Sequence, residues 1–246
     1  MVQAPSRRDR VRAATIEEIK QTARQILVAE GPDAVSLRAI ARDMGMTAPA
    51  LYRYFGSHED LIAHVVADIF TEIASGIRTA LTAAATGGAD MTGKLFAACS
   101  QFRHWSLNHR PEFSLLFGKP LPALEALHDD DVCAPCAMEF AGTFFALFAE
   151  LWEKQPFPVP ADEDLAPALR EQLARYRDGL GATGVPLGAL LTFLRCWVRL
   201  YGMVALEVFG HLSFALDDPA PMFEYTLAEL AGLVGPSYQP DGNASR

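Results

Sequence analysis

Residues 36 to 56, SLRAIARDMGMTAPALYRYFG, most constrain the fold, because two short helical patterns meet there across a glycine. Ser36 is a good N-cap for the first helix. Its apolar residues then recur at helical spacing, at Leu37, Ile40, Ala41 and Met44. Gly45 ends this helix, since glycine readily takes the left-handed conformation that a helix C-terminus commonly needs.

A second short helix follows the glycine. Thr47 can cap it, and Pro49 lies in its first turn, where a missing N–H has no intrahelical partner to lose. We expect Leu51 and Phe55, four residues apart, to point inward. The outward face is then Ala48, Pro49, Ala50, Tyr52, Arg53 and, near its edge, Tyr54. Small residues let a helix approach base edges, and Arg and Tyr reach phosphates or bases, so the pattern indicates a DNA-binding helix-turn-helix. A helical hairpin within a core is the alternative.

The flanking segments favour the helix-turn-helix. Residues 16 to 30 predict an amphipathic helix that Gly31 ends. Ser57 begins a fourth helix, with Asp60 at the spacing of a capping box, and its N–H groups could meet a DNA phosphate. The expected buried stripe of this helix is Leu61, Val65, Ile69, Ile73 and Ile77.

The run from residue 50 to residue 57, ALYRYFGS, with the following Glu59-Asp60-Leu61, resembles the N-terminal domain of the TetR/AcrR family of bacterial transcriptional regulators, over about residues 10 to 70. The resemblance implies that Tyr52, Tyr54 and the residue at position 58 contact the DNA backbone, while Arg38 and positions 48 to 50 face bases. We assign Ser36, Thr47 and Arg53 to the backbone as well. The family usually has lysine where this chain has His58. A neutral histidine can donate one hydrogen bond to phosphate but brings no full charge, so we expect this contact to be weaker and pH-dependent.

A second resemblance lies near the C-terminus. The segment CWVRLYG at residues 196 to 202, with VFGHL at residues 208 to 212, is similar to the C-terminal domain of a TetR subgroup named for a Trp-His-Gly motif.

Charge is unevenly distributed along the 246 residues, whose formal net charge is -9. Residues 1 to 60 carry nine basic and eight acidic side chains, whereas residues 61 to 246 carry twelve and twenty-two. The first segment can therefore approach DNA, and the acidic remainder should avoid it. Arginines at positions 7, 8, 10 and 12 form a basic arm that either follows a phosphate backbone or is a solvated, disordered terminus.

The remaining sequence predicts an all-α protein. Helices are expected at about 57–84, 92–109, 111–117, 132–154, 163–179, 186–213 and 219–234, separated by glycine and proline, including Pro120 to Pro122. The expected organisation is a flexible basic arm (1–9), a helix-turn-helix domain (10–70), a helical bundle for ligand binding and dimerisation (71–234) and a disordered tail (235–246).

The long helix at 186–213 has two different faces. One is aromatic and is assigned to the core. The other is assigned to a dimer interface, because glycines allow close helix approach; it holds Gly188, Thr192, Arg195, Arg199, Gly202, Leu206 and Gly210. The alternative is that both faces are buried within one subunit. A two-fold dimer would read a palindromic operator.

The central helices are rich in aromatic residues, most of which we expect to be core. A subset could line a small-molecule cavity: Phe102, Trp105, His109, Phe113, Phe117, Phe144, Phe148, Trp197 and Tyr201. The family resemblance implies an effector site in this region. The expected function is that of a homodimeric repressor released from its operator by a small, largely apolar molecule, with a thiol-responsive or ligand-independent DNA-binding regulator as the alternative.

Catalytic and metal-site patterns do not stand out. The sequence lacks a nucleophile elbow, Walker loop, dinucleotide fingerprint and HExxH, so we predict no enzyme activity, cofactor or metal. Cys133 and Cys136 have redox spacing but no second CxxC, and a structural role is favoured over a sensor. No signal peptide or membrane span is expected, because the best apolar run, near residues 143 to 149, ends at Glu150; the predicted location is cytoplasmic.

Overall fold

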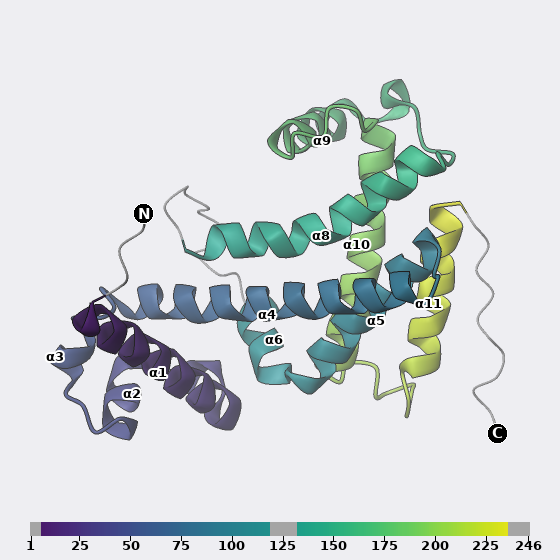
Figure 1. Ribbon diagram of the computed structural model, residues 1–246. Helices are drawn as coiled ribbons and strands as arrows, with labels where there is room; N and C mark the ends of the chain where they lie inside the picture. The colour runs from purple at the N-terminus through teal and green to yellow at the C-terminus, as the bar shows by residue number, and fades with distance from the viewer. Residues whose placement is uncertain (1–5, 119–131, 236–246) are drawn as a thin grey trace. The chain divides into compact units, whose positions relative to one another are not determined.

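The computed structural model describes residues 6–118 and 132–235, and in this part of the chain all regular structure is helical (Figure 1). The α-helices are α1 (Arg7–Glu30), α2 (Leu37–Asp43), α3 (Ala48–Leu51), α4 (His58–Thr86), α5 (Met91–Asn108), α6 (Arg110–Phe117), α8 (Cys133–Lys154), α9 (Pro167–Gly179), α10 (Leu187–Val208) and α11 (Ala220–Leu233). Short 3-10 turns lie at η1 (Pro32–Ala34) and η2 (Asp162–Asp164). The all-α prediction is confirmed. Three predicted features lie outside the described residues: the tail beyond residue 235, the helix break at Pro120 to Pro122, and the first five residues of the basic arm.

The chain divides into two compact units. The first comprises Met1–Ala74 and Asn108–Phe140, and the second comprises Ser75–Leu107 and Ala141–Arg246. The predicted division at residue 70 did not anticipate that α6 and the start of α8 belong with the N-terminal helices. The long helices α4 and α8 each contribute residues to both units.

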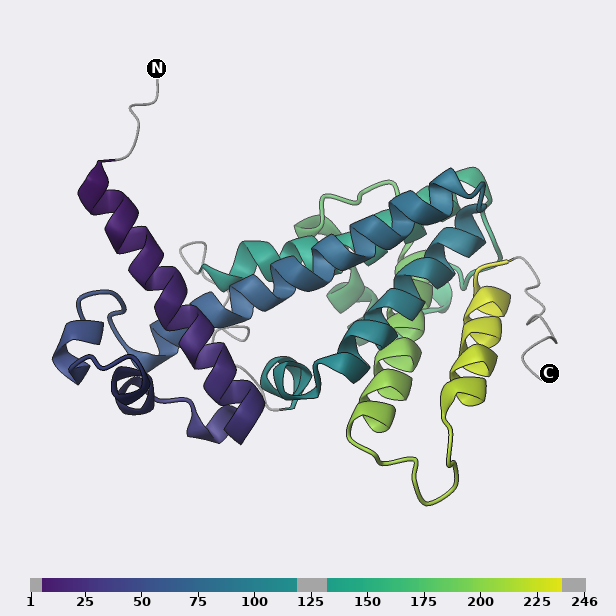
Figure 2. The same cartoon turned by 60° about the horizontal axis from the view of Figure 1, so that its bottom comes forward.

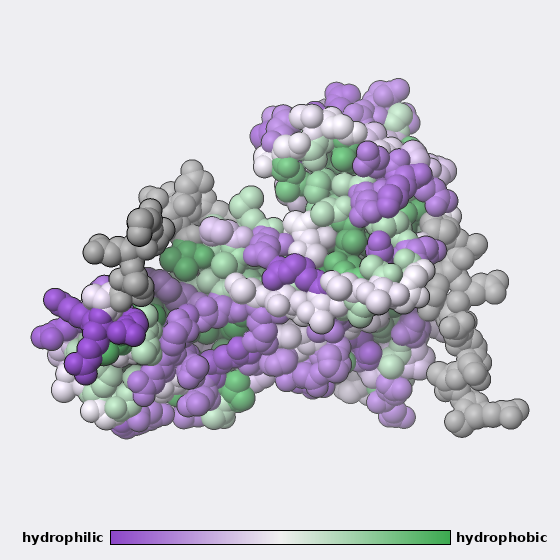
Figure 3. Space-filling model, viewed as in Figure 1, coloured by the Kyte–Doolittle hydropathy of each residue, from purple (hydrophilic) through white to green (hydrophobic). Residues whose placement is uncertain are grey.

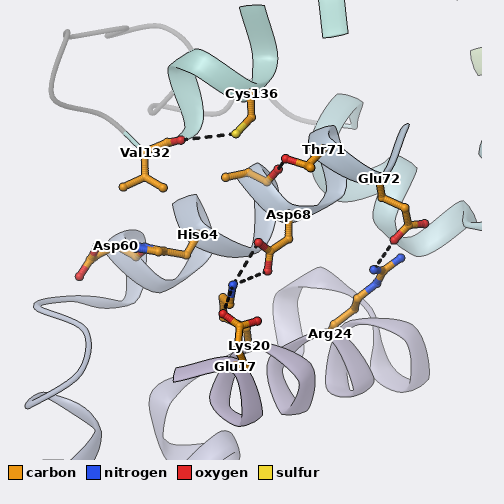
Figure 4. A network of polar contacts seen from close by, with 11 residues as sticks. Glu17, Lys20, Arg24, Asp60, His64, Asp68, Thr71, Glu72, Val132 and Cys136 are labelled. Carbon is orange, nitrogen blue, oxygen red and sulfur yellow. Dashed lines mark hydrogen bonds and ion pairs between the residues drawn. The ribbon is translucent and has the colours of Figure 1, made fainter. Parts of the chain in front are cut away.

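The N-terminal unit is built on the apolar stripes that the sequence predicts. Leu51 and Phe55 are 0% and 1% exposed, which confirms their inward orientation. The predicted stripe of α4, from Leu61 to Ile77, is buried throughout. Lys20 of α1 lies 2.7 Å from Asp68 of α4, an ion pair that joins the two helices, and it also lies 2.8 Å from Glu17 of its own helix (Figure 4).

Several helix ends differ from the prediction, and the start of α1 and the end of α10 differ most; α9 also begins at Pro167 instead of residue 163. α1 begins at Arg7, because Ser6 and Asp9 form a capping box, so residues 7 to 9 are helical rather than part of a flexible arm. α10 ends at Val208, five residues early. Gly210 has φ +71°, and the N–H of His211 donates to the carbonyl of Leu206 at 2.8 Å, a Schellman ending.

The C-terminal unit includes α5, α10 and α11, which lie side by side (Figure 2). Arg103 of α5 connects the other two. It forms a two-pronged ion pair with the buried carboxylate of Glu207 on α10, with one N–O distance of 2.7 Å, and lies 4.9 Å from the ring centroid of Phe223 on α11. The three helices are thus held in one arrangement.

Helices α8 and α10 are long and apolar enough, by length and composition, to cross a membrane, with mean hydropathies of 1.2 and 1.4 over their most apolar windows. No membrane span is predicted from the sequence. α10 has exposed Arg195 and Arg199 and the Arg103–Glu207 pair, which suits a helix in a protein bundle better than one in lipid.

Candidate DNA interface and effector cavity

The turn between α2 and α3 has the geometry that the sequence predicts. The hydroxyl of Ser36 accepts a hydrogen bond from the N–H of Ala39 at 3.2 Å and caps α2. Gly45 has φ +64°, and the N–H of Met46 donates to the carbonyl of Ala41 at 2.8 Å. A side chain with a Cβ would be strained at Gly45, so glycine sets the direction in which α3 leaves α2.

The outward surface of α2, of α3 and of the turn after α3 is accessible. Arg38, Thr47, Pro49 and Arg53 are exposed, Tyr52 is 56% exposed, and Ala48 and Ala50 are half-buried. Thr47 occupies the N-cap position, as predicted, but its side chain makes no capping hydrogen bond. Hydrophilic side chains predominate on the visible surface of the N-terminal helices (Figure 3).

Arg12 is not part of an extended arm. Its guanidinium donates a hydrogen bond of 3.0 Å to the carbonyl of Arg53 and lies 5.2 Å from the ring centroid of Tyr54. It therefore satisfies a carbonyl two residues past the end of α3, close to the helix terminus where a positive charge is favourable, and packs on the half-buried Tyr54. Sequence reasoning missed this contact, since 41 residues separate the partners.

The hydrogen-bond partner of His58 differs from the prediction. Its Nε2 lies 2.9 Å from the carbonyl oxygen of Val35, just before the α2 N-cap. A carbonyl only accepts, so Nε2 carries the proton, and the single N–H of a neutral imidazole is used within the protein. The prediction that neutral His58 donates to phosphate is therefore wrong for this arrangement. Its Nδ1 lies 4.0 Å from a carboxylate oxygen of Glu59.

The start of α4 is capped nearly as predicted. The hydroxyl of Ser57 accepts from the N–H of Asp60 at 3.1 Å, while the Asp60 carboxylate accepts from the N–H of Gly56 at 2.7 Å, one residue before the capping-box position. Two hydrogen bonds thus fix the turn formed by residues 56 to 60, one to the Ser57 hydroxyl and one to the Asp60 carboxylate.

The C-terminal unit contains an apolar cavity between α5, α8, α10 and α11. It offers about 60 Å³ to the centre of a water-sized sphere. Its wall consists of Thr92, Leu95, Phe96, Cys99, Phe144, Phe148, Phe193, Cys196, Trp197, Leu200, Leu230, Ala231 and Val234. Burial raises the pKa of the Cys99 thiol to about 12 and that of Cys196 to about 11, so both thiols are protonated at neutral pH.

Comparison with known protein families gives a match for the N-terminal helices and another for the C-terminal helices. Residues 19–65 match the model of the bacterial regulatory proteins of the tetR family, and residues 95–230 match that of the tetracyclin repressor-like C-terminal domain. The second match alone covers more than half of the chain. The protein belongs to the TetR family. It is a DNA-binding transcriptional regulator.

Individual relatives agree with this assignment. HTH-type transcriptional regulators Mb1846 of Mycobacterium bovis and Rv1816 of Mycobacterium tuberculosis are each 29% identical to this TetR family member over 210 residues, which cover 84% of its chain and 86% of theirs. The crystal structure of the regulatory protein SCO4313 is 31% identical, with a TM-score of 0.67, and covers 92% of this chain and all of that one. A protein of unknown function from Rhodococcus sp. RHA1 shares the fold, with a TM-score of 0.60 at 16% identity over 89% of this chain and 93% of that one. The resemblance to the Trp-His-Gly subgroup stays a prediction.

Some predicted pocket residues of this TetR family member line the cavity and others do not. Phe144, Phe148 and Trp197 are in its wall. Phe102 and Tyr201 are not part of the wall but pack against Trp197, with ring centroids 5.8 and 6.0 Å from that of Trp197. Trp105 is buried but does not line the cavity either. Three further candidates belong to the N-terminal unit and were wrongly placed, namely His109, Phe113 and Phe117. Phe113 and Phe117 pack on each other at 4.8 Å, and His109 lies 3.7 Å from Glu72.

The missed lining residues come mainly from the inner faces of α5 and α11. Helical spacing groups Leu95, Phe96 and Cys99 on one face, and Leu230, Ala231 and Val234 on another. Periodicity could have identified both faces as buried, but it carries no information that they face each other.

The predicted dimer face of α10 requires correction at three positions. Gly188 and Thr192 are buried within the subunit, because a Cβ at Gly188 would collide with the backbone oxygen of Pro160 and Thr192 donates to the Gly188 carbonyl at 3.0 Å. Gly210 ends the helix. Arg195, Arg199 and Leu206 are exposed and Gly202 is half-exposed, with open space where its Cβ would be.

Proposed function

We propose that the protein is a cytoplasmic homodimeric repressor that leaves a palindromic operator when a small, largely apolar effector fills the C-terminal cavity. The exposed surface of α3 and the start of α2 carry the proposal. Arg38, Ala48, Pro49 and Ala50 would face bases, while Ser36, Thr47, Tyr52, Arg53 and Tyr54 would hold the DNA backbone.

Dimerisation is supported by apolar side chains that α10 and α11 expose to solvent. They are Val198, Leu206, Met222 and Tyr225, exposed by 66%, 43%, 49% and 69%. Where such side chains form a contiguous patch, the patch commonly marks an interaction surface. Apolar side chains also gather at the surface beside α9 and α10 (Figure 3).

The thiol-responsive alternative has less support. Cys99 and Cys133 are buried, and Cys136 is half-buried with its thiol 3.9 Å from the carbonyl oxygen of Val132 (Figure 4). A reactive thiol needs exposure and a low pKa, whereas burial raises the pKa values of Cys99 and Cys196.

Footprinting of DNA from the region upstream of its own gene, at fixed salt, tests the DNA role. We expect a protected palindrome. Tyr52→Ala and Arg53→Ala should weaken binding to all sequences, whereas Arg38→Ala and Ala50→Ser should alter sequence preference. Equal weakening of every site by all four changes would contradict the division between positioning and reading residues.

Sedimentation of the full chain tests the dimer. Val198→Glu places a charge in the proposed interface and should yield a monomer. Val28→Glu is the matched control, because Val28 is 52% exposed on α1. A dimer that survives Val198→Glu unchanged would place the interface elsewhere.

A further inference from the structure

The wall of the C-terminal cavity contains five aromatic side chains, contributed by three helices. Phe96 comes from α5, Phe144 and Phe148 from α8, and Phe193 and Trp197 from α10. Several are fixed by neighbouring rings: Phe144 lies 5.7 Å from Trp197, and Phe148 lies 5.4 Å from Phe193 between centroids. Rings held in this way give an occupant aromatic edges and faces in set positions.

The same wall offers nothing to anchor a charge. None of its thirteen side chains is ionised at neutral pH, since the two thiols keep their protons. Among the described residues, no buried side-chain nitrogen or oxygen lacks a hydrogen-bond partner. A charged ligand group would therefore lose its hydration without meeting an opposite charge, which is strongly unfavourable for a carboxylate or ammonium.

The size of the space limits the occupant further. Its roughly 60 Å³ is several times the ~10–15 Å³ that one buried water needs and less than half of the ~150 Å³ of an apolar cavity that holds benzene. Because an apolar wall gives water too few partners, the space suits a compact molecule of at most one ring, for which the wall must also move outward slightly.

We propose that the cavity selects an uncharged single-ring aromatic molecule, held by ring packing without a charged anchor. This inference rests on the proposed role of the cavity as the effector site and specifies the chemical class of the effector. Recognition then depends on shape and on the absence of charge, and the ligand contacts α10 and α11 from their inner sides.

Three probes of similar size test the proposal on the purified full chain without DNA. Toluene is an uncharged aromatic, methylcyclohexane is uncharged but saturated, and benzoate is aromatic but charged. Binding is followed by tryptophan fluorescence, because Trp197 lines the cavity, and by the thermal unfolding midpoint. We expect toluene to bind two- to tenfold more tightly than methylcyclohexane and at least a hundredfold more tightly than benzoate.

Two variants link the signal to the cavity. Ala231→Leu fills the space and should abolish the toluene response, while Ala174→Leu makes the same change on α9 outside the wall and should leave it intact. If Ala231→Leu does not fold, Cys99→Ala provides the test by enlarging the space, and it should accept ortho-xylene more tightly than the wild type does.

Benzoate binding as tight as that of toluene, saturated binding tighter than aromatic binding, or a toluene response that survives Ala231→Leu would each overturn the proposal. The experiment distinguishes failure of the ligand proposal from failure of the DNA-binding proposal. Toluene binding by a protein that protects no DNA would support the ligand class and contradict the repressor function. A protected operator without toluene binding would support DNA binding and contradict the ligand class.

Discussion

Arg24 of α1 donates a hydrogen bond of 3.1 Å from its Nε to a carboxylate oxygen of Glu112 on α6, although 88 residues separate them. The Glu112 side chain is only 4% exposed. The same guanidinium lies 2.6 Å from Glu72 on α4, and the hydrogen bond to Glu72, followed by the charges of both carboxylates, raises the pKa of Arg24 (Figure 4). One side chain thus joins three helices, which explains why α6 belongs with the DNA-binding helices.

Removing Arg24 should destabilise the protein strongly. Arg24→Ala leaves the buried Glu112 carboxylate without its cation, and losing one partner of a buried pair costs about 3–5 kcal/mol. The free energy of unfolding in urea measures this cost. Arg175→Ala breaks the exposed Arg175–Glu171 pair, where the side chains are 65% and 73% exposed, and should change stability by less than about 1 kcal/mol. Equal costs for the two variants would show that burial of Glu112 does not govern the pair.

Arg12 should act through the position of α3. Because its guanidinium is occupied by the Arg53 carbonyl and the Tyr54 ring, Arg12→Ala should lower operator affinity by roughly two- to tenfold. The slope of log affinity against log salt should stay unchanged, since no phosphate contact is lost. Arg7→Ala, at the start of the same helix, is the control. A slope reduced by about one would instead identify Arg12 as a phosphate contact.

His58→Lys should strengthen DNA binding. The lysine supplies the full charge that neutral His58 lacks, so the salt slope should increase by about 0.9. It also removes the hydrogen bond to the Val35 carbonyl, at a cost of about 1 kcal/mol in stability. His104→Lys adds the same charge at an exposed position on α5 and should leave the slope unchanged. The test is operator affinity measured at several salt concentrations for both variants. An unchanged slope in His58→Lys would show that position 58 does not lie near a phosphate.

Burial of Cys99 should make the protein sensitive to alkali. Since its pKa rises from 9.0 to about 12, the unfolded thiol loses its proton first as the pH increases. The stability that the neutral buried thiol contributes is therefore complete below pH 9 and is lost between pH 9 and 12. Urea unfolding at pH 8 and pH 10.5 should show a smaller alkaline loss in Cys99→Ala than in the wild type. Cys136→Ala, at a half-buried thiol, should retain the wild-type loss. Identical losses in all three proteins would show that Cys99 does not titrate over this range.

Features that depend on near neighbours along the chain could be predicted from the residues alone. Ser36, Gly45 and the stripe of α4 were predicted correctly because capping, left-handed glycine and helical periodicity are local properties. The ALYRYFGS run identified the family for the same reason, since its residues stand at fixed offsets from one turn. The exposed surface of α3 followed from the burial of Leu51 and Phe55.

Which helix faces meet could not be predicted, because it depends on contacts between residues far apart in the chain. Periodicity indicates that Gly188 lies on one side of α10, but only the passage of Pro160 across it shows that the glycine allows an internal contact instead of a dimer contact. The cavity likewise depends on α5 and α11 approaching α10, and the pairing of Arg24 with Glu112 depends on α6 lying against α1. Such contacts join residues far apart in the chain, and their energies come from burial and charge pairing that no local pattern encodes.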